Sequence, residues 1–284
     1  MQVFSSVTEL RSYLAARRSD ARRSEKKTIG LVPTMGALHE GHLALIEASR
    51  QTNDITGCSI FVNPIQFNNQ EDLAKYPRTL EQDCALLDRA GCDFVFAPSA
   101  DDMYPKAPSL VLNFGPLESV MEGAFRPGHF NGVGIVVARL FNIVHPDRAY
   151  FGQKDLQQVA VVRQLVEDLA FQLEVVPCPT LREADGLALS SRNRRLSPEE
   201  RALAPQLYQV LTEAKERLLR GERVAEAKQF VQDYLAAIPA FRLEYFEVVH
   251  SVTMQPLEAV KPGHTALCIA AYLGPVRLID NVVF

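Results

Sequence analysis

The sequence lacks the patterns that several classes of protein require. Its five cysteines include no C-x-x-C pair, so neither a zinc site nor a disulfide framework is indicated, and reduced thiols are expected. No apolar segment approaches the roughly 18 uninterrupted residues of a membrane span. Thirty basic and 34 acidic residues give a net charge of −4, which argues against a general nucleic-acid binder. We therefore expect neither a membrane nor a nucleic acid as partner.

The first 27 residues are rich in arginine and serine, a composition that transit peptides share. Three acidic residues within this segment argue against that assignment. Val7, Leu10 and Leu14 have the spacing of an ordinary amphipathic helix, which we place at 5–18, and the basic run 17–27 is expected to be a solvated loop. The expected location of the protein is the cytoplasm.

Short apolar runs alternate with helical patterns in the first two thirds of the chain, which predicts a parallel sheet with crossover helices. The predicted strands are 29–32, 55–62, 92–97, 148–151 and 173–176, with a possible further strand at 110–114. The predicted helices between them are 39–51, 80–89, 134–144 and 155–169.

The pattern changes after Leu196. Ser197-Pro198 followed by two glutamates is a strong helix start. The predicted elements of this part are helices at 198–219 and 224–237, a strand at 241–249 and a hairpin formed by 266–273 and 276–283. The expected organisation is therefore α/β, with a first domain over 1–180 and a small α+β domain over 181–284.

The segment 29–46 combines a strand, a glycine turn and a helix. Its apolar run ends at Pro33, Gly36 permits a tight turn, and apolar residues recur at helical spacing from His39 onward. This layout directs free backbone N–H groups and the positive end of a helix dipole at an anion. His39 and His42 share one face of the first turn, where imidazoles can donate hydrogen bonds to phosphate. A nucleotide-phosphate site is predicted here.

Zinc binding by the two histidines is the alternative. A zinc site needs a third nitrogen, sulfur or carboxylate ligand, and the neighbouring sequence offers no obvious one. Glu40 stands between the histidines, but the His-Glu-x-x-His spacing of zinc proteases is absent. We therefore expect no metal held by the protein itself.

A second glycine turn precedes a helix at 152–155. Gly152 follows a predicted strand, and Lys154 supplies a point charge that suits a phosphate contact, although a surface role is equally compatible with one lysine. Asp155 is expected to be the N-cap of the following helix. Gln158, on the first turn of that helix, can pair with a carboxylate or hydroxyl without adding charge.

Other polar residues follow the predicted strand 55–62. Pro64 ends this strand, so Asn63 and Gln66 lie at its carboxyl end, where parallel sheets bind ligands. Further along, the segment 180–193 lacks periodicity and carries two serines and an arginine near its end.

Seven segments together resemble the pantothenate synthetase family of pantoate–β-alanine ligases. They are PTMGALHEGH (33–42), SIFVNPIQF (59–67), YPRT (76–79), RPGHF (126–130), FGQKDLQQ (151–158), READGLALSSRN (182–193) and RLIDN (277–281). Their order and spacing extend over nearly the whole chain, which makes the resemblance more specific than any single short motif.

The resemblance implies a Rossmann-like nucleotidyltransferase domain of the HIGH superfamily, with a smaller C-terminal domain that closes over it, and a homodimer. It also implies site residues. His39, His42, Lys154 and Arg192 would be catalytic, with His42 as proton donor. Pantoate would be bound by Gln66 and Gln158 with Asn63 nearby, and Gln66 would also lie near the β-alanine site. ATP would be bound by Met35, Gly36, Ala37, Leu38, His39, Glu40, Gly41, His42, Gly152, Gln153, Lys154, Asp155, Leu181, Leu189, Ser190, Ser191 and Arg192.

The implied activity is the ATP-dependent condensation of (R)-pantoate with β-alanine to pantothenate, a step of coenzyme A biosynthesis. Pantoate attacks the α-phosphorus of ATP, which releases pyrophosphate and gives pantoyl adenylate, and the amine of β-alanine then displaces AMP. No enzyme nucleophile is needed, so the protein must supply alignment and charge stabilisation, with Mg²⁺ bridging the triphosphate oxygens. The segment 182–193 would close to exclude water from the intermediate.

Two positions depart from the family pattern, and two other functions are compatible with the motifs. Gln153 stands where glutamate is expected and Ile65 where methionine is common, but Lys154 and Asp155 are retained. A nucleotidyltransferase that moves AMP or CMP onto a phosphate-bearing acceptor is one alternative, although the two glutamines favour a small hydroxy acid. A catalytically silent nucleotide sensor or RNA-binding relative is the other, and the intact phosphate-binding residues argue against it.

Overall fold

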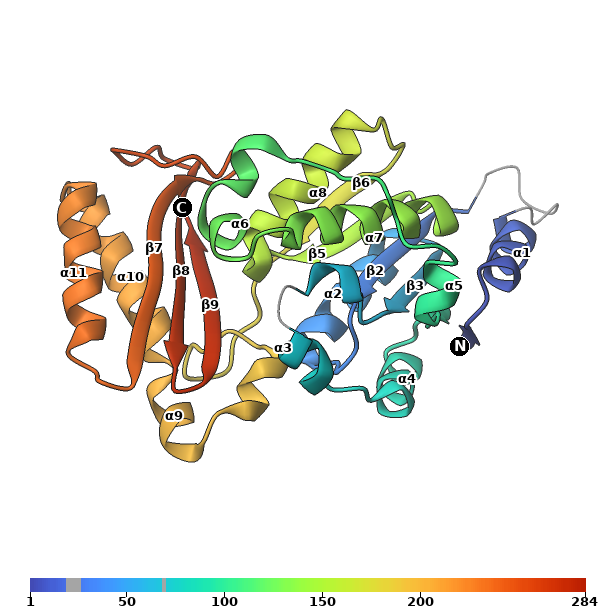
Figure 1. Cartoon of the computed structure of the whole chain (residues 1–284), viewed down its shortest axis with the longest axis horizontal. Coiled ribbons are helices and arrows are strands. Elements are labelled where there is room, and N and C mark those ends of the chain that lie inside the picture. The colour runs from blue at the N-terminus through green and yellow to red at the C-terminus, as the bar shows by residue number, and fades with distance from the viewer. Residues whose placement is uncertain (19–26, 68–69) are drawn as a thin grey trace.

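The first half of the molecule is built on a six-stranded parallel sheet with the strand order β1-β4-β3-β2-β5-β6 (Figure 1). The computed structural model describes residues 1–18, 27–67 and 70–284, so most of the basic loop expected at 17–27 lies outside the described residues. The strands are β1 (Gln2–Phe4), β2 (Ile29–Thr34), β3 (Ile55–Ile60), β4 (Phe94–Phe96), β5 (Arg148–Gly152) and β6 (Glu174–Cys178).

Helices cover both faces of this sheet. The helices are α1 (Val7–Arg18), α2 (Glu40–Thr52), α3 (Gln70–Lys75), α4 (Leu80–Arg89), α5 (Ala100–Met103), α6 (Met121–Phe125), α7 (His129–Val144) and α8 (Leu156–Asp168). Alternate strand residues enter different cores: Leu31 packs with residues of α1, α7 and α8, whereas Val32 packs with residues of α2 and α4. This alternation is the period of two that a strand buried on both faces requires.

The strand order reverses between β2 and β5, which are neighbours in the sheet although far apart in sequence. In doubly wound sheets this switch point opens a crevice at the carboxyl ends of the strands. The turn after β2 leads into α2, and the turn after β5 leads into α8, so both predicted glycine turns meet at this crevice.

The second half is a three-stranded antiparallel sheet with helices on one face (Figure 1). Its elements are α9 (Pro198–Leu203), α10 (Gln206–Leu219), α11 (Val224–Ala236), β7 (Phe241–His250), β8 (Thr265–Leu273) and β9 (Val276–Val283). One face of the sheet packs with α10 and α11, and the other contributes Val249, Ala266 and Cys268 to the core that contains α7 and α8. The α+β half is therefore packed directly against the α/β half.

Several predicted elements differ from the structure. β2 runs through Pro33 to Thr34 and pairs there with Ser59 of β3, so proline does not end the strand. The strand expected at 110–114 is wrong: Leu110 and Val111 are 63% and 73% exposed and belong to no strand. The helix expected over 198–219 is two helices, α9 and α10, because Pro205 interrupts it. The short strand β1 is not among the predicted elements.

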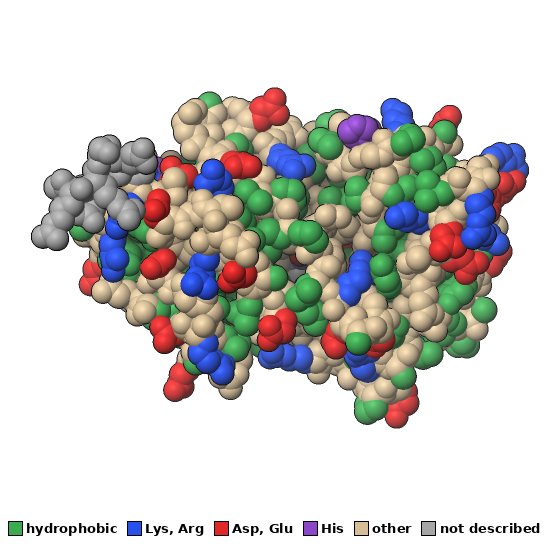
Figure 2. Space-filling model, turned by 180° about the vertical axis from the view of Figure 1, so that it is seen from behind, with side chains coloured by type: hydrophobic (Ala, Val, Ile, Leu, Met, Phe, Trp, Pro, Cys, Tyr) green, Lys and Arg blue, Asp and Glu red, His purple; other side chains and the backbone are tan. Residues whose placement is uncertain are grey.

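Two further features concern the charged surface and the length of the helices. On the face seen in Figure 2, acidic and basic side chains are intermixed rather than gathered by sign among the coloured residues. Among the helices of the described residues, none is both long and apolar enough to cross a bilayer.

Candidate active site

His39 and His42 form a capping box at the start of α2. His39 is the N-cap, and its Nδ1 accepts the backbone N–H of Gly41 at 3.2 Å. The backbone N–H of His39 donates to Nδ1 of His42 at 3.3 Å. Gly41 is required between them, because a Cβ there would lie 2.9 Å from Cε1 of His39. Since Nδ1 is the acceptor in both rings, each neutral imidazole carries its proton on Nε2 and can donate it to a ligand.

Both histidines are neutral at pH 7. Burial, together with the nearby His39 and Lys154, lowers the pKa of His42 to about 3. Burial, with Lys154 and Arg194, lowers the pKa of His39 to about 4. A neutral imidazole donates a hydrogen bond rather than a proton. The role of proton donor implied for His42 therefore requires that a bound triphosphate raise its pKa.

Asp83, at the start of α4, holds the turn between β2 and α2. Its carboxylate is 1% exposed and accepts the backbone N–H groups of Ala37 at 3.0 Å and Leu38 at 2.8 Å, and the hydroxyl of Thr79 at 3.0 Å. Ala37 has a φ of 50°, an uncommon conformation for a residue with a Cβ, and this carboxylate stabilises it. The expectation that this turn offers free N–H groups to an anion is wrong for these two amides.

A cavity of about 220 Å³ lies at the switch point, in front of these histidines. Most of the residues assigned to ATP and pantoate line it: Met35, His39, Gly41, His42, Gln66, Gly152, Lys154, Asp155, Gln158, Leu181, Leu189, Ser190, Ser191 and Arg192. The other residues assigned to ATP do not line the cavity: Gly36, Ala37 and Leu38 in the turn after β2, Glu40 at the first position of α2, and Gln153 in the turn after β5. Asp155 holds the N-cap position of α8, yet its side chain makes no capping bond and instead lies 3.6 Å from Nζ of Lys154.

The side-chain amide of Gln66 lines part of the cavity. This side chain is 7% exposed, and its Nε2 lies 3.1 Å from Sδ of Met35. Asn63 does not line the cavity, because its amide donates to Oε1 of Gln66 at 3.2 Å and to the carbonyl of Gly132 at 3.0 Å. A Cβ on Gly132 would lie 2.6 Å from the backbone of Gln66, so glycine allows α7 to pack against this turn. Asn63 is thus placed to orient Gln66.

Arg126 and His129, from the RPGHF segment, are two cavity residues to which sequence reasoning assigned no role. His129 donates from Nδ1 to the carbonyl of Gln66 at 3.0 Å, and its Nε2 accepts from Arg126 at 3.2 Å. This pattern needs a neutral ring, and burial together with Arg126 lowers the pKa of His129 to about 4. Their signal in the sequence was the RPGHF segment of the family resemblance, whereas nothing marked the single acid Asp83 in the first turn of a helix.

One wall of the cavity is apolar. Phe61 and the face of α7 that carries Val133, Val136, Val137 and Leu140 contribute to it. Such a wall can bury methyl groups, and imidazole, lysine and arginine side chains line the same cavity. The cavity therefore suits a ligand with both an aliphatic part and a polyanionic part.

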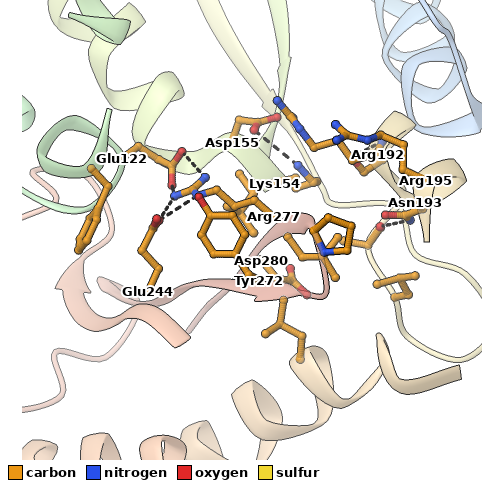
Figure 3. Close-up of a pocket in the computed structure, with 18 of the residues that line it drawn as sticks. Glu122, Lys154, Asp155, Arg192, Asn193, Arg195, Glu244, Tyr272, Arg277 and Asp280 are labelled. Atoms are coloured by element: carbon orange, nitrogen blue, oxygen red, sulfur yellow. Dashed lines mark hydrogen bonds and ion pairs between the residues drawn. The ribbon is translucent and has the colours of Figure 1, made fainter. Parts of the chain in front are cut away.

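A second cavity of about 420 Å³ adjoins the first, because Arg126, Lys154, Asp155, Ser190 and Arg192 line both. Figure 3 shows Lys154 between Arg192 on one side and a cluster of Glu122, Arg277 and Glu244 on the other. Arg277 donates two hydrogen bonds to Glu122, at 2.6 and 2.9 Å, and so joins β9 to α6. The α+β half therefore forms part of the wall of the site.

No group of three or more His, Cys, Asp or Glu side chains able to hold a metal occurs within residues 1–18, 27–67 and 70–284. A divalent cation would therefore have to be carried by the phosphate oxygens of a bound nucleotide, with Asp155 as the acidic residue beside Lys154.

A doubly wound sheet whose switch point holds a cavity lined by imidazole, lysine and arginine defines the class of nucleotide-binding α/β proteins. Within that class the chain belongs to the pantoate-beta-alanine ligase family, whose model matches residues 2–283.

Known relatives agree over the full length. The pantothenate synthetase of Phocaeicola vulgatus is 50% identical over 286 residues, which cover 100% of this chain and 99% of the relative. The crystal structure of pantothenate synthetase from Thermus thermophilus matches with a TM-score of 0.91 and 48% identity, covering 100% of this chain and 99% of that one. The pantoate-beta-alanine ligase of Francisella tularensis, solved with a β,γ-ATP compound and β-alanine, matches with a TM-score of 0.80 and 34% identity, covering 100% and 97%.

Proposed function

We propose that this chain condenses (R)-pantoate with β-alanine at the expense of ATP, through pantoyl adenylate, and releases AMP and pyrophosphate. Membership of the pantoate-beta-alanine ligase family supports this activity. The single observation that carries it is one cavity that His39, His42 and Lys154 line together with the buried Gln66 and an apolar wall. Triphosphate fits the first set, and the hydroxyls and geminal methyl groups of pantoate fit the second.

In the first step, the protein stabilises charge that moves toward the leaving pyrophosphate. The Nε2–H groups of His39 and His42 and the ammonium of Lys154 donate to phosphate oxygens, and Arg192 adds a planar cation from the segment over the cavity. Gln66 and Gln158 hold pantoate by its hydroxyls. Because an amide carries no charge, the pantoate carboxylate keeps its nucleophilicity for the α-phosphorus.

In the second step, the amine of β-alanine attacks the acyl carbon, and AMP leaves. The hydrolysable anhydride must be kept from water while the amine enters. Leu189, Ser190, Ser191 and Arg192 line the cavity from a segment that follows the α/β half, which supports the proposal that 182–193 closes over the intermediate. The division into domains 1–180 and 181–284 is proposed on the same ground, with the second as a lid.

Mg²⁺ is proposed as the cofactor of the reaction: Asp155, the acidic residue beside Lys154, would help to hold it, and it would supply positive charge that stabilises the leaving pyrophosphate. A homodimer remains our expectation from the family resemblance, and light scattering of the purified protein tests it. A cytoplasmic location is also proposed, supported by the five cysteines, all of which are free thiols as a reducing compartment favours.

The deciding experiment is mass spectrometry of the products from protein, ATP, Mg²⁺, pantoate and β-alanine. Equal amounts of pantothenate, AMP and pyrophosphate are expected. Formation of ADP, or of AMP without pantothenate, would overturn the proposal. Pantoate-dependent pyrophosphate release in the absence of β-alanine separates this enzyme from a nucleotidyltransferase that needs a phosphate-bearing acceptor.

A further inference from the structure

The RLIDN segment at 277–281 ends in two polar residues that the proposed mechanism does not yet use. Asp280 and Asn281 lie on β9, in the α+β half, and are 4% and 3% exposed. Buried polar side chains cost free energy unless their hydrogen bonds compensate, so the partners of these two indicate what they do.

Asn281 holds the turn that carries Lys154. Its Nδ2 donates to the carbonyl of Gln153 at 2.9 Å and to the carbonyl of Lys154 at 2.8 Å. Because both partners are carbonyl acceptors, the NH₂ group of the Asn281 amide must face them. Its Oδ1 therefore points away from them and has no partner among the described residues. One side chain from β9 thus fixes two successive peptide groups of the turn after β5.

Asp280 holds the beginning of the segment that carries Ser190, Ser191 and Arg192. Its carboxylate accepts two hydrogen bonds from Arg182, at 2.7 and 2.9 Å. Arg182 also donates to the carbonyl of Gly186 at 3.0 Å, which closes the segment on itself, and its guanidinium lies 3.7 Å from the centre of the Tyr208 ring. Arg182 also donates to the carbonyl of Asn281 at 3.2 Å, so the contacts of Asp280 and Asn281 are connected through this arginine.

We propose that Asp280 and Asn281 are positioning residues that align Lys154 and the Ser190–Arg192 segment on the same triphosphate. Figure 3 shows Asp280, Lys154 and Arg192 around one cavity, and Lys154 and Arg192 also line the first cavity. A lysine has a flexible stem, so its ammonium is aligned for catalysis only when its backbone is held. Because Asp280 and Asn281 are adjacent on one strand, both phosphate-binding segments are held by the same rigid element.

This inference rests on the proposed function, and a double-mutant cycle tests it. Asn281→Ala is measured in the wild-type and in the Lys154→Ala background, by pantoate-dependent exchange of pyrophosphate into ATP and by ATP affinity from calorimetry. In the wild-type background, Asn281→Ala is expected to lower the exchange rate about tenfold. In the Lys154→Ala background it is expected to change the rate less than twofold, because its effect acts through that lysine.

A matching double-mutant cycle tests the contact between Asp280 and Arg182. Asp280→Asn keeps the shape of the side chain but removes the charge that binds Arg182 bidentately. Its effect on exchange is expected to be about tenfold in the wild type and to fall below twofold in an Arg192→Ala background. Asn281→Ser, which retains one donor, is expected to lie between Asn281→Ala and the wild type, and it replaces the alanine variant in the cycle if that variant does not fold.

The control is Thr265→Val on the neighbouring strand β8. Thr265 is fully buried and its hydroxyl donates to the carbonyl of Lys261 at 2.9 Å, so this variant loses a buried hydrogen bond in the same sheet without touching either phosphate-binding segment. It is expected to lower the melting temperature but to leave exchange within twofold of the wild type.

Two results would overturn the inference: wild-type exchange in Asn281→Ala, or an undiminished loss when Lys154 is already alanine. An effect of Thr265→Val on exchange equal to that of Asn281→Ala would also overturn it, because the loss would then follow stability alone. If the wild type itself shows no pantoate-dependent exchange, the proposed function fails. The ATP-affinity cycle still decides the inference, since it needs no second substrate.

Discussion

The backbone N–H of His39 donates to the imidazole Nδ1 of His42 at 3.3 Å, so one histidine of the pair sets the tautomer of the other. The two rings lie 4.1 Å apart between centroids, and both line the cavity. The same two side chains therefore cap the beginning of α2 and belong to the proposed phosphate site. Substitutions that separate these two roles give a direct test.

His42→Asn is expected to retain the cap and lose the donor. The asparagine Oδ1 can replace Nδ1 as acceptor for the N–H of His39, but nothing replaces Nε2–H at the phosphate. Adenylate formation should fall about 10²–10³-fold, or about 3–4 kcal/mol of barrier, as for other donors that stabilise transition-state charge. Single-turnover pyrophosphate release measures this, and thermal unfolding checks that the fold is kept. Near-normal adenylate formation in His42→Ala would refute the assignment.

The stability of the protein is expected to fall in acid, in two stages. The pKa values of His39 and His129 are lowered to about 4 in the folded protein, so the unfolded chain binds more protons as the pH falls from 6.5 to 4. Stability present above pH 6.5 is therefore lost across this window. Arg277 lowers the pKa of Glu122 to about 2 despite its burial, and that contribution, complete above pH 4.5, is lost between pH 4.5 and 2.

Urea unfolding at pH 7, 6, 5, 4 and 3 measures this dependence. His129→Asn should reduce the loss of stability between pH 6.5 and 4, because asparagine does not bind a proton in this range. A stability that stays constant or rises as the pH falls through this window would contradict the prediction.

Asp83→Asn is expected to destabilise the protein by about 1–3 kcal/mol. The carboxylate accepts three hydrogen bonds, and an amide in its place turns an NH₂ group toward at least one of these donors, leaving a buried group unsatisfied. The KM for ATP should rise as the turn before α2 loosens. Asp101→Asn, at an exposed acid in the first turn of α5, is the control and should change neither quantity.

Arg277→Met is expected to cost about 3–5 kcal/mol of unfolding free energy, because it leaves Glu122 buried without its main partner. Adding Glu122→Gln should restore part of that loss, since the uncompensated charge is then absent. Urea unfolding of the two single variants and the double variant measures the coupling. Additive losses in the double variant would show that the pair is not coupled.

Removing Mg²⁺ with EDTA is expected to abolish adenylate formation without changing the melting temperature of the nucleotide-free protein. The reason is that, in the proposed mechanism, the ion acts on the triphosphate, and the described residues offer no cluster of metal ligands that would bind it without nucleotide. Added Mg²⁺ should restore activity in proportion to the concentration of the Mg–ATP complex. A clear fall of the melting temperature in EDTA would instead indicate a structural metal.

Elements with strong local patterns were predicted well. Helix α4 has the predicted bounds Leu80–Arg89, and the hairpin of β8 and β9 turns at Gly274-Pro275 as expected. The strand expected at 110–114 is wrong because a strand needs a partner, and a short, mostly apolar segment cannot show whether one is available. Helix and turn signals are local, whereas strand pairing is decided elsewhere in the chain.

The sequence by itself determined the chemistry available: two histidines at helical spacing after a glycine turn, a second turn with lysine, and glutamines beyond a strand. Only the tertiary structure decided how they are held. Asp83 reaches Ala37 across 46 positions, and Asn281 reaches Gln153 across 128. Hydrogen bonds of this kind join segments that meet only after the sheet has formed, so no periodicity in the chain records them, and they hold the two turns that border the cavity.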